Sequence, residues 1–288
     1  MPPDERGMPP DQSTLKPASA AAAPCKICGG AAPLYGVVDF HKSCEEFRGL
    51  RLPLSGVPIY YRRCARCGFL FTDAFDCWTK EQFKEHIYND DYRTVDPDYR
   101  TIRPSANAGV VTQMWAAVKA ETRVLDYGGG NDTLCTALRN NGFAAAISYD
   151  PMVPEHAQRP PGKFDLVTCF ETMEHLPDPD AGVSSIIDCV AEPGLILYST
   201  LVLPAKFDQI GVAWWYVGPR NGHISIFTRQ ALAAAWGRHG YKTVSFNDNL
   251  HLAFRTLPAF LARLQSLADG LTIQSNPPPT PARVGEAA

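Results

Sequence analysis

The chain has 288 residues, of which 45% are hydrophobic and 20% charged, which suffices for one sizeable α/β core and a smaller module. A formal net charge of -3 and a pI near 6.2 provide no global attraction to nucleic acid or to an anionic membrane. No apolar run reaches the roughly 18–20 residues of a membrane span, and the Pro/Ala-rich start lacks the features of a signal peptide, so we expect a cytoplasmic protein.

Both ends of the chain have the composition of disordered segments. Residues 1–24 are rich in Pro, Ala and Ser and show no periodicity, which predicts a disordered tail. Residues 276–288 begin with Asn-Pro-Pro-Pro-Thr-Pro and predict a second tail.

Two CxxC-Gly units within residues 25–75 predict a zinc-binding module. Each unit presents two thiolates from one tight turn, and four thiolates satisfy tetrahedral zinc. A redox-active CxxC is the alternative, but two pairs without thioredoxin-like surroundings count against it. The module has only a small surplus of Lys and Arg, so a solvated face is preferred over a nucleic-acid surface. The predicted ligands are Cys25, Cys28, Cys64 and Cys67.

Strand and helix patterns alternate after a linker and lead-in helix at 76–122, and they define a domain over 123–275. Alternation of this kind predicts a parallel, doubly wound, Rossmann-like sheet. The last two strands are separated by three residues, and such a short connection makes only an antiparallel hairpin. The expected strands are 123–127, 146–150, 164–170, 194–202, 242–246 and 251–256, with helices near 132–141, 180–190 and 228–239, the last capped by Thr228.

A glycine-rich turn after the first strand of this domain predicts a nucleotide-like cofactor. Asp126, Gly128 and Gly130 form the turn, where glycines admit the ligand to the backbone and the following helix offers free N–H groups. Asp150 ends the second strand, where an acid accepts hydrogen bonds from ribose hydroxyls. The alternative is a plain strand-to-helix turn with Asp150 as a surface cap.

The segments Val124–Gly130, Tyr149-Asp150, Phe164–Val167 and Glu171–His175 resemble a class I S-adenosylmethionine-dependent methyltransferase over about residues 105–260. The resemblance implies that Asp126 and the glycines hold the methionine end of the cofactor and that Asp150 holds the ribose. Asp132 departs from the family, which often has glycine there. This side chain either narrows the loop or caps the helix.

Glu174, His175 and His223 are the candidates for catalysis, and Glu171 is assigned to the cofactor site. Quinone-pathway O-methyltransferases and small-RNA 2′-O-methyltransferases share a similar Glu-x-x-Glu-His. By resemblance to the latter, all four residues would bind a second divalent metal. Sugar C-methyltransferases resemble the chain through the paired CxxC module and the His-x-x-x-Phe pattern, and there His175 or His223 would act as general base. A third interpretation has Glu174 and His175 only capping a helix.

Three consecutive aromatic residues, Trp214, Trp215 and Tyr216, precede His223 in a predicted loop. They suit either a lid over an apolar or sugar-like substrate or a hydrophobic plug beneath the loop.

Together these features predict a methyltransferase that uses S-adenosylmethionine and structural zinc. Its expected substrate is a small molecule, sugar-like or phenolic, with an oxygen or carbon nucleophile. The alternatives are an RNA methyltransferase gripping its substrate through the zinc module, and a non-catalytic partner protein with a methyltransferase fold.

Overall fold

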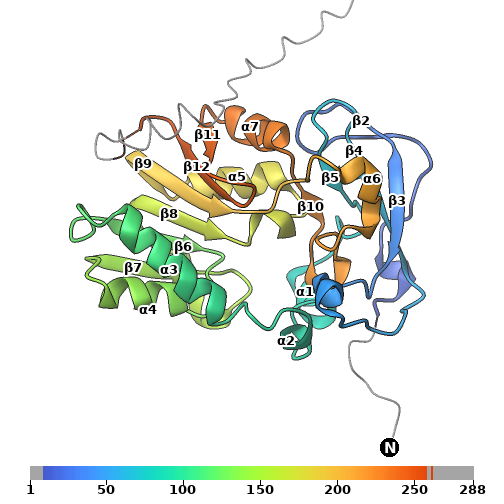
Figure 1. The fold of residues 1–288 in the computed structure, drawn as a ribbon, viewed down its shortest axis with the longest axis horizontal. Coiled ribbons are helices and arrows are strands. Elements are labelled where there is room, and N and C mark those ends of the chain that lie inside the picture. The colour runs from blue at the N-terminus through green and yellow to red at the C-terminus, as the bar shows by residue number, and fades with distance from the viewer. Residues whose placement is uncertain (1–8, 258–260, 262–288) are drawn as a thin grey trace, which may run out of the picture.

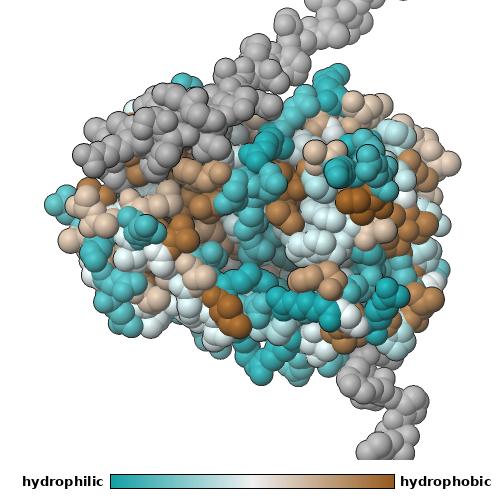
Figure 2. Space-filling model, in the orientation of Figure 1, coloured by the Kyte–Doolittle hydropathy of each residue, from teal (hydrophilic) through white to brown (hydrophobic). Residues whose placement is uncertain are grey.

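The computed structural model describes residues 9–257 and residue 261. Figure 1 shows two halves side by side: a helix-flanked sheet, and a smaller β-rich half that contains the N-terminal part of the chain. Figure 2 shows a hollow between these halves, bordered largely by hydrophilic residues. Within the part of the chain that the structure describes, no helix is both long and apolar enough to cross a membrane.

The larger half contains a six-stranded sheet in the order β11-β12-β9-β8-β6-β7. The strands β6, β7, β8 and β9 are parallel to one another, whereas β12 pairs antiparallel with both β9 and β11. The predicted doubly wound sheet with a reversed terminal hairpin is therefore confirmed. The strands are β6 (Arg123–Tyr127), β7 (Ala145–Tyr149), β8 (Phe164–Phe170), β9 (Val190–Ser199), β11 (Lys242–Ser245) and β12 (Leu250–Phe254).

Alternate residues of the central strands face opposite helical layers. Val124 pairs with Leu166 and belongs to one buried cluster, whereas the next pair, Leu125 and Val167, belongs to another. Burial on both faces explains why adjacent positions of these strands, such as Val124-Leu125 and Leu166-Val167, are apolar. The helices of this half are α3 (Ile102–Met114) beside α4 (Thr133–Asn140), and α5 (Pro179–Ile187) beside α7 (Arg229–Gly237). Thr228 caps α7, as predicted, by accepting from the backbone N–H of Ala231.

The smaller half is built on a four-stranded sheet in the order β10-β5-β4-β3. Three strands come from the N-terminal module, but β10 belongs to the segment that connects β9 to α7, so the sheet joins distant parts of the chain. The strands are β3 (Leu34–Asp39), β4 (Pro58–Arg63), β5 (Leu70–Phe71) and β10 (Ser225–Ile226); a small hairpin pairs β1 (Ala23–Pro24) with β2 (Ala31–Ala32). The helices here are α1 (Lys80–His86), α2 (Tyr92–Val95) and α6 (Phe207–Ile210).

Composition predicted a disordered tail over residues 1–24, whereas residues 9–24 lie against the module. The buried Arg62 guanidinium donates to the carbonyls of Ser19 and Ala21 at 2.8 and 2.9 Å. Trp78 Nε1 donates to the carbonyl of Thr14. Side chains far along the chain hold the backbone of this segment, so its own composition contained no signal of order. The predicted tail at 276–288 lies outside the described residues.

Candidate active site

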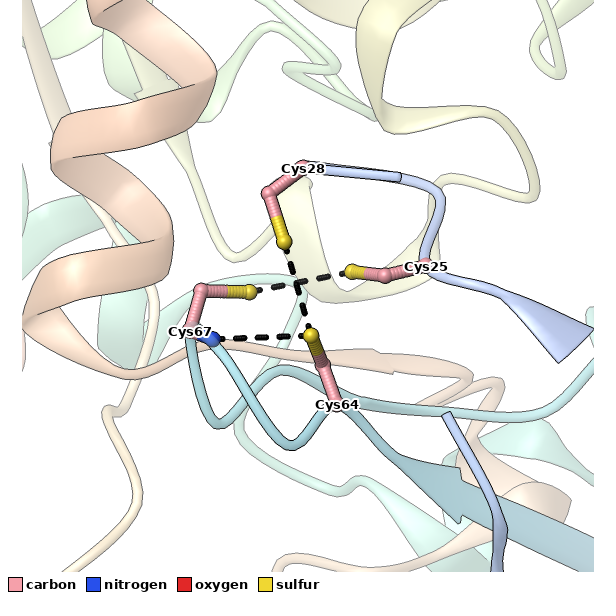
Figure 3. A group of neighbouring side chains, drawn as sticks. All are labelled: Cys25, Cys28, Cys64 and Cys67. Carbon is pink, nitrogen blue, oxygen red and sulfur yellow. Dashed lines mark hydrogen bonds between the residues drawn. The ribbon is translucent and has the colours of Figure 1, made fainter. Parts of the chain in front are cut away.

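The four cysteines of the two CxxC units converge on one point (Figure 3). Cys25 Sγ lies 3.7 Å from Cys67 Sγ, and Cys28 Sγ lies 3.4 Å from Cys64 Sγ. A tetrahedral centre with Zn–S bonds of about 2.3 Å has S–S edges of about 3.8 Å, so the spacing fits this geometry. A disulfide needs S–S contacts of about 2.05 Å, and all four residues are free thiols.

The two cysteine turns have the same local geometry. In each, the glycine after the second cysteine has positive φ, +69° at Gly29 and +71° at Gly68, a conformation that glycine adopts without steric cost. Each of these glycines donates its N–H to the carbonyl of the first cysteine of its unit. Backbone N–H groups also point at sulfur, for example Ile27 N at 3.4 Å from Cys25 Sγ. Backbone donors of this kind stabilise thiolate charge, which suits metal ligands.

The predicted cofactor turn joins β6 to α4 and needs glycine for steric reasons. Gly128 has φ of +75°, and an added Cβ would lie 2.3 Å from Thr172 Oγ1 on the loop that follows β8. An added Cβ at Gly129 would lie 2.3 Å from Asp126 Oδ2. At Gly130, with φ of +59°, such an atom would meet nothing within 4 Å. The turn is thus tightly packed where it contacts Thr172 and Asp126, and it is open at Gly130.

Asp126 lies beneath this turn and is only 3% exposed. Its Oδ1 accepts a 2.7 Å hydrogen bond from Thr168 Oγ1. Burial raises the pKa of Asp126 to about 7, although the Thr168 hydrogen bond acts in the opposite direction. A buried carboxyl with this pKa gains a partner when a cation arrives nearby.

Asp150 follows β7 directly and faces the same turn. Its Oδ2 accepts from the backbone N–H of Gly130 at 3.0 Å, and its Oδ1 accepts from Met152 N at 2.8 Å. Asp132 has φ of +32°, so this departure from glycine keeps a left-handed backbone. Its side chain makes no capping bond and instead pairs with Arg139 at 2.5 Å. The Asp132 carboxylate is therefore engaged by Arg139 of α4.

Glu171 ends β8 in a left-handed conformation, with φ of +48°, which is uncommon for a residue other than glycine. The Ser199 hydroxyl holds it, accepting from Glu171 N at 2.9 Å and donating to Oε1 at 2.6 Å. Burial and the neighbouring Glu174 raise the pKa of Glu171 to about 7, although Ser199 and Arg103 act in the opposite direction. A strained, half-buried carboxyl at the carboxyl end of a parallel strand is typical of a functional position.

The three predicted catalytic residues lie together. Glu174, His175 and His223 each place a ligand atom within 4.8 Å of the others, and the two imidazole centroids are 5.1 Å apart. Glu174 and His175 lie in a short 3-10 helix (Met173–His175) after β8, whereas His223 arrives from the loop before β10. Glu171 lies outside this cluster, so the four-ligand metal site is brought together only in part. The helix-capping interpretation of Glu174 is not supported, because its carboxylate is fully buried.

Backbone carbonyls define the tautomer of both histidines. His175 Nδ1 lies 3.0 Å from the carbonyl of Gly222, and His223 Nδ1 lies 2.9 Å from the carbonyl of Tyr216. A carbonyl only accepts, so each Nδ1 bears the proton and each Nε2 keeps a lone pair. Burial lowers the pKa of both rings, and the proximity of His175 lowers the pKa of His223 further. Both are therefore neutral bases or metal ligands at pH 7.

Tyr216 organises this cluster, a role that the sequence did not indicate. Its hydroxyl donates to Glu174 Oε1 at 2.6 Å and accepts from the backbone N–H of Leu201, while its carbonyl accepts from His223 Nδ1. Glu174 Oε2 is buried and has no hydrogen-bond partner. Burial raises the pKa of Glu174, against the lowering effect of Tyr216. The only advance signal was the position of Tyr216, seven residues before His223.

The other two aromatic residues of this loop act as packing groups. Trp214 is 7% exposed and contacts Phe207, which supports the plug interpretation. Trp215 packs against Phe47 of the N-terminal module with ring centroids 4.9 Å apart. The acid-rich stretch before α3 also has a structural role, because Asp96 holds Arg103 through two hydrogen bonds of 2.6 and 2.8 Å.

Comparison with known proteins places residues 99–245, about half of the chain, within a family described as "Methyltransferase domain". A ubiquinone biosynthesis O-methyltransferase from Pectobacterium carotovorum is 32% identical over 134 residues, covering 44% of this chain and 56% of the relative. One from Xanthomonas campestris is 27% identical over 154 residues, covering 51% of this chain and 63% of the relative. The chain thus spans a little over half the length of these relatives.

Among solved structures, an O-methyltransferase family protein from Burkholderia thailandensis is similar, with a TM-score of 0.47 and 14% identity. The match covers 62% of this chain and 63% of that one.

Proposed function

Since this chain belongs to the methyltransferase-domain family, we propose that it transfers a methyl group from S-adenosylmethionine to an oxygen or carbon nucleophile of a small molecule. One observation carries the proposal. β6 and β8 are adjacent and parallel, so the glycine turn after β6 meets the loop after β8 at one sheet edge, where Glu174 and His175 lie with His223. The two loops touch where Gly128 packs on Thr172.

The residues around the turn fit the cofactor. The absence of a side chain at Gly130 leaves the backbone accessible to a ligand, Gly128 allows the turn to pack on Thr172, and Asp126 offers a buried carboxyl for a cationic group. Asp150 stands beside Gly130, where ribose hydroxyls are held in nucleotide-binding α/β folds. Glu171 completes the set of acids at this edge. When bound, S-adenosylmethionine supplies an electrophilic methyl group on a sulfonium, so positioning provides much of the catalysis.

We assign the two histidines to proton removal. Each ring is neutral and offers the Nε2 lone pair, so either accepts the proton of an acceptor O–H or C–H as the new bond to the methyl carbon forms. Glu174 stabilises the imidazolium that results, because its charge lies within the same cluster. The bound cofactor would supply the methyl group and would retain the bonding electrons on its sulfur as the neutral thioether.

The same three residues also suit a divalent cation. Each of them offers a ligand atom within 4.8 Å of the others, and Glu174 Oε2 has no hydrogen-bond partner, which a bound cation would provide. Dialysis against a chelator separates the two mechanisms. If turnover stops and Mn²⁺ or Mg²⁺ restores it, the metal mechanism replaces the general-base mechanism.

We assign structural zinc to Cys25, Cys28, Cys64 and Cys67, because four reduced thiols with tetrahedral spacing favour a closed, structural site. A centre of this kind requires a reducing compartment, which supports the cytoplasm as the location. We propose no nucleic-acid partner.

The proposed function is tested in two stages. Calorimetry with S-adenosylhomocysteine measures cofactor binding, and we expect a micromolar dissociation constant. Turnover is then screened with two acceptors: the catechol 3,4-dihydroxybenzoate and a nucleotide-linked ketosugar. The names of the relatives favour an oxygen acceptor, and the paired CxxC units favour a sugar. Absence of S-adenosylhomocysteine binding by the zinc-loaded protein would refute the proposal and favour a non-catalytic role.

A further inference from the structure

The catalytic loop that carries His223 is built into the sheet of the N-terminal module. β10 pairs with β5 through Ser225 and Ile226. Just before β10, the buried Tyr61 hydroxyl of β4 donates to the carbonyl of His223 at 2.7 Å. The backbone N–H of Thr72 donates to the carbonyl of Ile224 at 3.0 Å. The module therefore holds the backbone at three consecutive residues, His223, Ile224 and Ser225.

The segment at β10 also contacts the loop that carries Glu174 and His175, so it positions the rest of the catalytic cluster. Ile224 N donates to the carbonyl of Glu174 at 3.0 Å, and Ser225 Oγ donates to the carbonyl of Leu176 at 2.6 Å. The module also contacts this loop directly, because Lys26 Nζ donates to the carbonyl of Pro177 at 2.8 Å. Lys26 lies within the first CxxC unit.

The cysteine centre lies at the points where the module meets these loops. The second CxxC unit is the turn between β4 and β5, and the Cys67 carbonyl accepts from Thr228 Oγ1 at 2.6 Å. β5 has only two residues, Leu70 and Phe71, too few to define a register by pairing alone. A metal that joins the two CxxC units would therefore set the position of β5 and, through it, of β10.

Apart from the packing of Gly128 on Thr172, the cofactor turn depends on different contacts. Asp126 is held by Thr168 of β8, Gly128 N donates to the carbonyl of Tyr149, and Asp150 is held by Gly130. All of these lie within the six-stranded sheet and its loops.

We propose that the cysteine module is a positioning element for methyl transfer. It places His223 and the Glu174–His175 loop against the cofactor turn, so that loss of its metal disables proton removal and leaves cofactor affinity nearly unchanged. The inference rests on the proposed function and assigns Tyr61 as its principal positioning residue.

Cys28→Ser, with the exposed Cys77→Ser as matched control, tests the metal. Zinc content, S-adenosylhomocysteine affinity by calorimetry, and ¹³C-histidine NMR signals are compared with the native protein. We expect Cys28→Ser to lose zinc, to shift the His175 and His223 signals, and to retain affinity within about threefold. Zinc loss with unchanged histidine signals would overturn the proposal. So would cofactor affinity that falls in step with zinc, because the module would then support the whole fold.

Tyr61→Phe keeps all four cysteines and removes only the hydrogen bond to the His223 carbonyl, with Tyr60→Phe on the same strand as control. We expect native zinc content, native cofactor affinity, a shifted His223 signal, and a roughly tenfold lower kcat with the acceptor found in the screen, with unchanged KM for S-adenosylmethionine. A native His223 signal in Tyr61→Phe would contradict the role. The NMR readout needs no acceptor, so this outcome is distinct from a native protein that fails to bind the cofactor.

Discussion

Asp126→Asn should stabilise the ligand-free protein while it weakens cofactor binding. Asp126 is 3% exposed beneath the glycine turn, and burial raises its pKa from 3.8 to about 7. The native state therefore binds a proton that the unfolded chain releases at pH near 4. Stability from this group is present below pH 4 and is lost as the pH rises to about 7.

The size of the effect follows from the pKa difference. About three pKa units at about 1.4 kcal/mol each give an upper estimate of roughly 4 kcal/mol of lost stability at pH 8. Asparagine has nearly the same shape, and its Oδ1 still accepts from Thr168. Its Nδ2 would face Ser148 Oγ, which is buried without a hydrogen-bond partner. The variant should therefore equal the native protein at pH 4 and exceed its stability by about 1–4 kcal/mol at pH 8.

Urea unfolding at pH 4.5, 6 and 8 measures this difference, with the exposed Asp188→Asn as control. Glu171, whose pKa is also raised to about 7, leaves a residual pH dependence of the same sign in the variant. Calorimetry on the same samples should give at least tenfold weaker S-adenosylhomocysteine binding. A variant that is less stable than the native protein at pH 8, or that binds the ligand equally well, would refute the assigned role of Asp126.

The remaining predictions concern the catalytic cluster and the turn. His175→Gln and His223→Gln should each lower kcat by about 10²-fold or more in steady-state assays, with cofactor affinity within threefold; a variant that retains a tenth of native turnover would exclude that ring as the base. Gly128→Ala should weaken S-adenosylhomocysteine binding at least tenfold, because the new Cβ would lie 2.3 Å from a threonine hydroxyl. The control is Gly109→Ala in α3, where the new Cβ would meet nothing within 4 Å; it should add about 0.5–1 kcal/mol to the free energy of unfolding. Equal affinities of the two alanine variants would argue against the turn as the cofactor site. Tyr216→Phe removes a donor that lowers the pKa of its carboxylate partner, so the acid limb of the pH–rate profile should move to higher pH and stability should fall by about 1–3 kcal/mol. An unmoved acid limb would show that this hydroxyl does not tune the site.

Local signals made much of the fold predictable. The mainly apolar strands at 123–127 and 164–170 are buried on both faces over most of their length, which is why pattern alone located them. The cysteine centre was equally accessible, because each CxxC-Gly turn forms by bonds within five residues.

Long-range pairing was beyond the reach of the sequence. β10 has two residues and joins β5 about 155 positions earlier along the chain, so no local pattern marked it. The role of Tyr216 was hidden for a similar reason, because it depends on contacts with Glu174 and Leu201 from other loops. Glu171 and Glu174 are three residues apart, and one of the alternatives placed both in a single metal site. Left-handed backbone at Glu171 and the Ser199 hydrogen bonds instead direct the two carboxylates to different partners.

A crystal structure of the zinc-loaded protein with S-adenosylhomocysteine tests the central claim most directly. The account predicts the ligand along the turn at residues 126–130, its ribose at Asp150, and its sulfur facing the Nε2 atoms of His175 and His223. Ligand bound elsewhere, or a sulfur atom directed away from both imidazoles, would contradict it.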